Sequence, residues 1–304
     1  MIAAGFSADL INGSQQASWE GEVDEANWAK KYVLCGAKHQ SPIDIQKKKV
    51  VYNNKMSLFE LEGYDGPLHG DFAITNNGHS VQIQLPSSMK IKKGLPHVYT
   101  AVQMHLHWGG LDLETSGSEH TIDGLRYMAE LHIVHYNSEL YSSFDEAVDK
   151  PEGLAVLAFL YEVYGNIKNL LKAGQVTTVK TLDPLAMLPE NLDNFYRYQG
   201  SLTTPPCTEN VLWTVFDTKV ILSQNQIKLL ENTLLDWHNK TLRNDYRHAQ
   251  PLNDRVVQSS FQVKMPKGDV CQHEISTKLT LIETELLDVK KRVATDPLKG
   301  KSGK

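Results

Sequence analysis

The stretch Gln103-Met104-His105-Leu106-His107-Trp108-Gly109 alternates with period two, and so does the stretch Ala129-Glu130-Leu131-His132-Ile133-Val134-His135. This alternation predicts two β-strands. Side chains at positions i and i+2 of a strand point to the same face, so we expect His105 and His107 to lie side by side. Taken alone, a His-x-His pair fits two histidines on a strand surface as well as it fits a metal site.

The second stretch supplies a third histidine on one face. His132 shares its face with Glu130 and Val134, whereas His135 falls on the opposite face. Three neutral imidazoles, from His105, His107 and His132, leave a zinc ion with one open tetrahedral position for water. The pattern therefore predicts a catalytic zinc site, although imidazole ligands also accept copper, cobalt or nickel.

Two further motifs accompany these histidines. Gly117-Ser118-Glu119-His120-Thr121 lies between the two strands, and Ser201-Leu202-Thr203-Thr204-Pro205-Pro206 lies far downstream. In this order the four motifs resemble those of the α-type carbonic anhydrase family. The resemblance runs from about Trp19 to Phe261, and it includes further matching segments at Trp28, Gln40–Ile45, Asn76–His79, Gly153–Leu157, Arg247 and Ala249–Leu252. Residues 262–304 have no counterpart in the minimal family domain.

The fold expected from composition and resemblance is mixed α+β but predominantly β. Short alternating runs such as Ser80–Leu85, with abundant Gly and Pro, favour a sheet-rich body. The resemblance implies a central twisted, mostly antiparallel sheet with short peripheral helices, and 145–148 and 223–235 are the best helix candidates. We expect an N-terminal extension (1–18), a catalytic domain (19–261) and a C-terminal tail (262–304) with an amphipathic or coiled-coil helix.

Charge and hydropathy exclude several classes of partner. The net charge is -5 over 304 residues, which provides no field for nucleic acid and no basic membrane patch. No apolar run approaches the ~18 residues that suggest a membrane span. We therefore expect a small-molecule substrate.

The three cysteines indicate the compartment. In the extracellular branch of the family a disulfide joins the positions of Cys35 and Cys207, and such a bond persists only in an oxidising compartment. The alternative is two unrelated buried thiols. The resemblance thus implies a secreted protein whose signal peptide has been removed. Cys271 is left as a free thiol or an interchain bond, and sequons at Asn12 and Asn239 are compatible with a glycoprotein.

The chemistry depends on three uncharged ligands. Zinc held by imidazoles acidifies its water, so hydroxide becomes available near neutral pH. The resemblance implies reversible hydration of CO2 to bicarbonate and a proton by this zinc-bound hydroxide. CO2 needs an apolar wall beside the hydroxide, and the residues assigned to it are Val134, Val156, Leu202, Val211 and Trp213, which otherwise are ordinary core residues.

Other polar residues receive roles from the resemblance. Thr203 accepts a hydrogen bond from the hydroxide and donates one to Glu119, and Thr204 lies beside the departing bicarbonate. Each ligand needs an outer partner. These partners are Gln103 for His105, the backbone carbonyl of Asn244 for His107, and Glu130 for His132. We expect His120 to be a buried structural histidine, because a fourth ligand would occupy the open position.

Proton release is assigned to a loop histidine. His79 matches the shuttle position of the family, and imidazole has an ordinary pKa of about 6.5, close to ambient pH. The alternative is an exposed histidine with no role. Asn77 and Gln82 would hold the intervening waters. Trp19 stands where the family usually has a tyrosine, and because an indole only donates hydrogen bonds, we expect an altered proton wire and slower transfer.

The tail predicts self-association. Ile275, Leu279, Ile282, Leu286, Val289 and Val293 follow a 4-3-4-3-4 spacing over about 275–293, which is typical of a coiled-coil seam. We therefore expect a homo-oligomer, with copies of Cys271 close together just ahead of the seam. The alternative is an amphipathic helix packed on its own domain.

A second functional class remains open from sequence. The chain would then be a secreted structural or carrier protein that oligomerises through its tail and in which catalysis is weak or incidental. The intact set of His79, Glu119, Thr203 and the three histidines favours the enzyme, because a purely structural protein has no physical need of all of them.

Overall fold

The computed structural model describes residues 25–109, 117–163, 176–222, 235, 242 and 244–264. Several predicted features lie outside these residues: Trp19, both sequons, Cys271, the tail beyond Lys264 and nearly all of the expected helix 223–235. The chain divides into two compact units, Met1–Val263 and Lys264–Lys304. The first of these units carries all of the elements described below.

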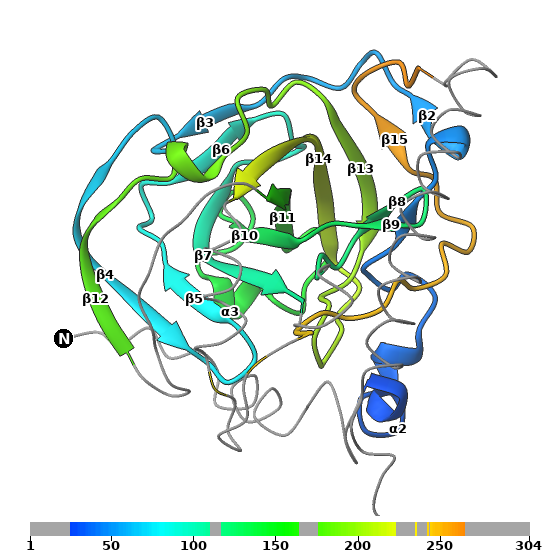
Figure 1. Ribbon diagram of the computed structural model, residues 1–304, viewed down its shortest axis with the longest axis horizontal. Helices are drawn as coiled ribbons and strands as arrows, with labels where there is room; N and C mark the ends of the chain where they lie inside the picture. The colour runs from blue at the N-terminus through cyan, green and yellow to red at the C-terminus, as the bar shows by residue number, and fades with distance from the viewer. Residues whose placement is uncertain are drawn as a thin grey trace, which may run out of the picture. The chain divides into compact units, whose positions relative to one another are not determined.

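A large sheet of twelve strands forms the body of the first unit (Figure 1). Its strands follow the order β12 (Val176–Leu182), β4 (Leu68–Asn76), β5 (Val81–Gln84), β7 (Tyr99–Trp108), β10 (Ala129–Asn137), β11 (Leu154–Val163), β14 (Val211–Leu222), β13 (Phe195–Gly200), β15 (Gln258–Ser259) and β2 (Val51–Tyr52), and β3 (Glu60–Glu62) joins through β6 (Lys90–Lys93). Most neighbours are antiparallel, but the β11–β14 and β15–β2 pairs are parallel. The sheet is therefore mixed, with a parallel pair near its centre.

A small second sheet and short helices complete the described part. The sheet contains β1 (Asp44–Ile45), β8 (Thr121–Ile122) and β9 (Leu125–Arg126). The helices are α2 (Trp28–Lys31), α3 (Phe144–Ala147), and the 3-10 turns η1 (Glu25–Asn27), η2 (Val33–Gly36), η3 (Lys47–Lys49) and η4 (Leu185–Met187). The prediction of a predominantly β fold with few short helices is confirmed.

Helix α3 begins one residue earlier than predicted. The hydroxyl of Ser143 accepts a hydrogen bond from the backbone N–H of Glu146 at 3.2 Å. This side-chain cap satisfies an otherwise unpaired donor and lets the helix begin at Phe144 rather than at Asp145.

The central strands are buried on both faces. On β10, Leu131 and Ile133 belong to one buried apolar cluster, which also contains Met104 and Phe159. Val134, the next residue after Ile133, belongs to a second cluster, which also contains Val156 and Trp213. Strand alternation therefore assigns odd and even positions of β10 to opposite cores, and it directs His132 to the same side as Val134.

The predicted disulfide between Cys35 and Cys207 is present. It links residues 172 positions apart and lies in a small buried cluster with Trp28. Cys207 comes directly after the Thr203–Pro206 segment, so the bond ties that segment to the N-terminal part of the domain. The bond agrees with the predicted secreted localisation, since disulfides persist in oxidising compartments.

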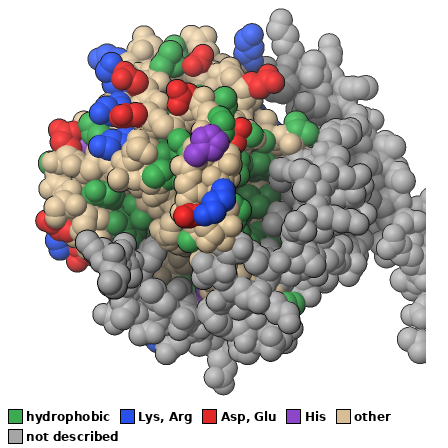
Figure 2. Space-filling view, turned by 90° about the vertical axis from the view of Figure 1, so that its left-hand side faces the viewer, with side chains coloured by type: hydrophobic (Ala, Val, Ile, Leu, Met, Phe, Trp, Pro, Cys, Tyr) green, Lys and Arg blue, Asp and Glu red, His purple; other side chains and the backbone are tan. Residues whose placement is uncertain are grey.

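The described surface carries both signs of charge. Figure 2 shows acidic and basic side chains interspersed on the face formed by the β4–β12 and β3–β6 side of the molecule. Lys92 pairs with Glu62 at 3.3 Å, and Lys93 pairs with Glu60 at 2.5 Å. Among the described residues, no helix is long and apolar enough to cross a bilayer.

Buried His135 predicts a specific loss of stability in acid. Its Nε2 lies 2.5 Å from the hydroxyl of Tyr64, and burial lowers its pKa from 6.5 to about 4. Between these two pKa values His135 is protonated in the unfolded chain but neutral in the folded chain. The free energy of unfolding therefore falls as pH drops below 6.5. Between pH 7 and pH 5 this residue alone should cost about 2 kcal/mol.

The measurement is urea unfolding at both pH values, with chelator present throughout so that metal loss contributes equally. A His135→Gln variant should show a pH dependence smaller by about this amount. Replacement of exposed His69 by Gln serves as the matched control. Equal pH dependence in the wild type and the His135→Gln variant would contradict the assignment.

Candidate metal centre

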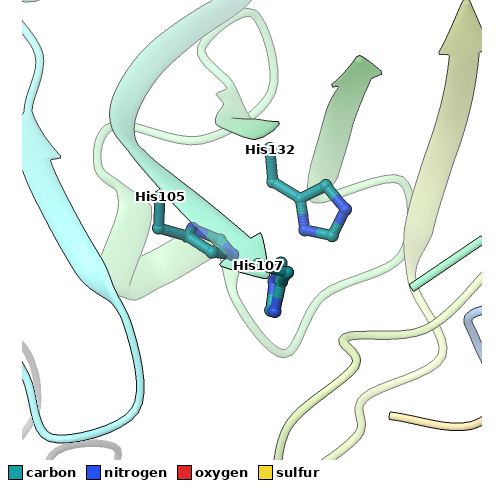
Figure 3. Close-up of side chains that lie close together, drawn as sticks. All are labelled: His105, His107 and His132. Carbon is teal, nitrogen blue, oxygen red and sulfur yellow. The ribbon is translucent and has the colours of Figure 1, made fainter. Parts of the chain in front are cut away.

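Strand pairing brings three histidines to one point. In the antiparallel register of β7 and β10, His132 is directly opposite His105, and Glu130 is opposite His107. Figure 3 shows the rings of His105 and His107 on one strand converging with the ring of His132 on its neighbour. The ring centroids lie 4.7 to 5.2 Å apart, and one ligand atom from each residue lies within 4.8 Å of the others.

The environment keeps the imidazoles of His105 and His107 neutral. His107 and His132 are 2% and 1% exposed. Burial, and then the nearby rings of His107 and His132, lowers the pKa of His105 well below 6.5. Burial also lowers the pKa of His107, although the charge of Glu119 opposes that shift. Because a metal binds the unprotonated nitrogen, depressed pKa values prepare the rings for coordination.

Each ring is oriented by an outer hydrogen-bond partner. Gln103 Oε1 lies 2.8 Å from Nδ1 of His105, and Glu130 Oε1 lies 2.7 Å from Nε2 of His132. His107 Nδ1 donates to the backbone carbonyl of Asp245 at 2.5 Å. These contacts leave Nε2 of His105 and His107 and Nδ1 of His132 for the metal, and they fix the tautomer of each ring.

The partner of His107 differs from our prediction, which named the carbonyl of Asn244. Asn244 is exposed and has a left-handed backbone with φ of 52°. Asp245 is buried and makes two hydrogen bonds with the backbone of Trp108. Its N–H donates to the Trp108 carbonyl, and its carboxylate accepts from the Trp108 N–H at 2.6 Å. The carbonyl that accepts from His107 therefore belongs to the residue after the predicted one.

Glu119 is fully buried beside the three rings. Its Oε1 accepts a hydrogen bond from the backbone N–H of Arg247 at 2.8 Å. Its Oε2 lies 3.6 Å from Nε2 of His107 and 3.9 Å from Nδ1 of His132. Within the described residues Oε2 has no hydrogen-bond partner. This oxygen is free to accept a hydrogen bond, and the bond from Thr203 to Glu119 stays a prediction.

The buried polar atoms at this point fit a bound cation. Nε2 of His107, like Oε2 of Glu119, is buried without a protein partner in the described part of the chain. Such orphaned groups are costly unless something satisfies them. Three imidazole nitrogens at a common point match the donor set of a zinc site. The residues present thus fit the metal that the sequence predicts.

A second cluster nearby is structural. His120, Glu130 and His132 also lie close enough to share an ion. However, His120 Nδ1 lies 2.6 Å from Glu130 Oε1, and its Nε2 lies 2.7 Å from the hydroxyl of Tyr198. Although burial alone raises the pKa of Glu130, His120 and His132 hold it well below 4.5. These groups satisfy one another, so His120 supports the site and does not bind metal.

The residues assigned to the apolar wall share one buried cluster with the site. Val134, Val156, Val211 and Trp213 are at most 4% exposed, and Leu202 packs against them. The ring centroid of Trp213 lies 4.8 Å from that of His132. The structure therefore gathers these side chains on the face of the sheet that carries His132.

The described residues predicted to take part in proton transfer lie on β5 and in the turn before it. Gln82 on β5 is the register partner of His105. In the turn before β5, Asn77 Oδ1 accepts hydrogen bonds from the backbone N–H groups of His79 and Ser80 at 2.9 and 2.7 Å. His79 is partly buried.

Thr203 is 6% exposed, and Thr204 is partly exposed.

Sequence reasoning missed the parts played by Asp245 and Arg247. The guanidinium of Arg247 donates to the carbonyls of Cys35 and Ser41 and to Gln40, while its backbone N–H binds Glu119. Arg247 is one of the positions at which the sequence resembles the family, and that resemblance could have indicated its role. The carbonyl of Asp245 leaves no signal, because every residue type has one.

Comparison with known proteins identifies the class. Residues 23–261 match the family model described as eukaryotic-type carbonic anhydrase. The matched range contains all three histidines and every strand described above. The chain therefore belongs to the carbonic anhydrase family, and it is a zinc-dependent enzyme of CO2 hydration.

Particular relatives are similar over most of the chain. Carbonic anhydrase 6 of Homo sapiens is 50% identical over 273 residues, covering 84% of this chain and 88% of the relative. Carbonic anhydrase 6 of Bos taurus is 49% identical over 268 residues, covering 83% of each. Carbonic anhydrase 12 of Homo sapiens is 41% identical, covering 83% of this chain and 74% of the relative.

The contact between Glu130 and His132 predicts slow metal release. A Glu130→Gln substitution keeps the shape but removes the charge that pairs with both His120 and His132. Loss of an outer partner of this kind typically costs 10- to 100-fold in metal affinity. We expect zinc to dissociate into chelator faster by about that factor. Glu162→Gln, an exposed change on β11, is the control, and an unchanged release rate in the Glu130 variant would refute the role of this contact.

Proposed function

We propose that this chain hydrates CO2 reversibly to bicarbonate and a proton, with zinc held by His105, His107 and His132. The observation that carries this proposal is the convergence of three ring nitrogens within 4.8 Å of one another, two of them on the buried side chains of His107 and His132. When bound, zinc lowers the pKa of a coordinated water to about 7, the value established for carbonic anhydrase itself, and so supplies hydroxide at neutral pH.

Thr203 and Glu119 aim the attacking oxygen in this proposal. A hydroxyl both donates and accepts, whereas a carboxylate only accepts. If the hydroxyl of Thr203 donates to a carboxylate, its lone pairs remain to receive a hydrogen bond from the attacking oxygen. Support comes from Glu119 Oε2, which is buried beside the ligand nitrogens and lacks a partner among the described residues. Arg247 holds the other carboxylate oxygen and so limits its rotation.

Apolar side chains hold CO2 close without solvating it. We assign this wall to Val134, Val156, Leu202, Val211 and Trp213, supported by their common burial around His132. Thr204, which is partly exposed, is assigned to the departing bicarbonate. The backbone of its segment is fixed by hydrogen bonds from Cys207 to Thr204 and from Leu202 to Thr208.

His79 carries the released proton outward in this proposal, with Asn77 and Gln82 ordering the intervening waters. Support comes from the position of Gln82 opposite His105 and from the turn that holds the backbone of His79. An imidazole is suited to this step because its ordinary pKa lies near ambient pH.

Replacing His79 by Ala should separate proton transfer from chemistry. We expect kcat to fall about 100-fold, the low end of what a positioned acid–base group contributes. Because CO2 attack precedes proton release, kcat/KM should change little, and added imidazole buffer should restore kcat. The control is His69→Ala on β4, which should leave both parameters unchanged. An equal loss of kcat and kcat/KM without rescue would rule out the shuttle.

The tail remains a proposal about assembly. We assign homo-oligomerisation to the heptad spacing of residues 275–293, with Cys271 near the start of the seam. A chain cut after Phe261 should then form a smaller assembly than the full chain in sizing by light scattering, with zinc-dependent activity retained. The same subunit number for both chains would exclude the tail as the assembly element.

A further inference from the structure

Two irregular segments meet at the metal centre. Ser118–Glu119 carries the buried carboxylate, and Asp245–Arg247 carries both the carbonyl that binds His107 and the N–H that binds Glu119. Neither segment belongs to a strand or a helix. Their relative position therefore depends on individual contacts and not on a hydrogen-bonded ladder.

Arg126 contacts both segments. Its Nη1 donates a hydrogen bond to the backbone carbonyl of Ser118. The guanidinium carbon lies 4.2 Å from the centre of the Tyr246 ring, and Tyr246 stands between Asp245 and Arg247 in the chain. A single side chain thus links the segment of Glu119 to the segment of Asp245.

The base of Arg126 is firmly held. Arg126 lies on β9, where it is the register partner of Thr121 on β8 (Figure 1). The next residue, Tyr127, donates its N–H to the Ser118 hydroxyl at 2.8 Å, and its carbonyl accepts from the N–H groups of Gly117 and Ser118 at 2.7 and 2.9 Å. Because the backbone of Arg126 is fixed by the β8–β9 pair, its guanidinium can hold both segments at a defined position relative to these strands.

The chemistry of the contacts suits arginine. A planar guanidinium can donate in its plane while its face lies against an aromatic ring, which an ammonium cannot do in the same way. Tyr246 is only 8% exposed, so this cation–π contact is largely removed from water and correspondingly stronger.

We propose that Arg126 is a positioning residue of the metal centre. By joining the Ser118 carbonyl to the Tyr246 ring, it sets the distance between Glu119 and the Asp245 carbonyl, and so holds His107 in its ligating orientation. This inference rests on the proposed zinc site, but it concerns metal retention as well as turnover.

Zinc release from the holoprotein into excess chelator tests the proposal directly. Arg126→Met keeps the aliphatic stem but loses the guanidinium, and we expect release to accelerate about 10-fold, the low end for loss of an outer partner. Tyr246→Leu should accelerate release similarly. The double variant should be no faster than the faster single variant, because both changes break the same link.

Matched variants separate positioning from general destabilisation. Tyr246→Phe keeps the ring and should release zinc within about twofold of the wild-type rate. Lys31→Met on α2 removes another cation–π pair, in which the Lys31 ammonium lies 5.4 Å from the centre of the Tyr32 ring, and it should leave the rate unchanged. The Tyr246 pair of variants keeps the test informative if Arg126→Met does not fold.

Three results would overturn the proposal. Arg126→Met could release zinc at the wild-type rate, or the effects of Arg126→Met and Tyr246→Leu on the release rate could be fully additive in the double variant. Tyr246→Phe could also release zinc as fast as Tyr246→Leu. Failure of the zinc enzyme itself gives a different result, because the wild type would then neither retain zinc nor hydrate CO2.

Discussion

The antiparallel register of β7 and β10 is the constraint on which the site depends. It places His132 directly opposite His105, while strand alternation puts His107 on the same face. A shift of one residue would turn every side chain of β10 over and exchange His132 with hydrophobic residues of the opposite core. The apolar clusters on both faces oppose that shift, so the packing that stabilises the sheet also assembles the ligands.

Burial gives the ligands their chemical state, and the outer hydrogen bonds give them direction. Desolvation lowers the pKa values of His105 and His107, so both rings stay neutral. Gln103, Glu130 and the Asp245 carbonyl then select which nitrogen of each ring faces the centre. The disulfide at Cys207 and the Arg126 contact act further out, on the irregular segments that carry Thr203, Glu119 and Asp245.

Sequence reasoning predicted the features that periodicity dictates and missed those that depend on the path of irregular backbone. Period two identified the three histidines and put His135 on the other face. It could not identify the carbonyl of Asp245, since a backbone acceptor has no sequence signature and its position depends on hydrogen bonds with Trp108. The position of Glu119 Oε2 beside the ring nitrogens of His107 and His132 also has no sequence signature. The central parallel pair β11–β14 also depends on long-range topology and not on local pattern.

The most direct test of this account is the CO2 hydration rate of the purified protein as isolated, after removal of metal by chelation, and after zinc is added back, beside a His132→Ala variant. Activity should disappear when zinc is removed, return when zinc is added back, and be absent from the variant. A folded, zinc-loaded protein without hydration activity, or a variant as active as the wild type, would contradict this account.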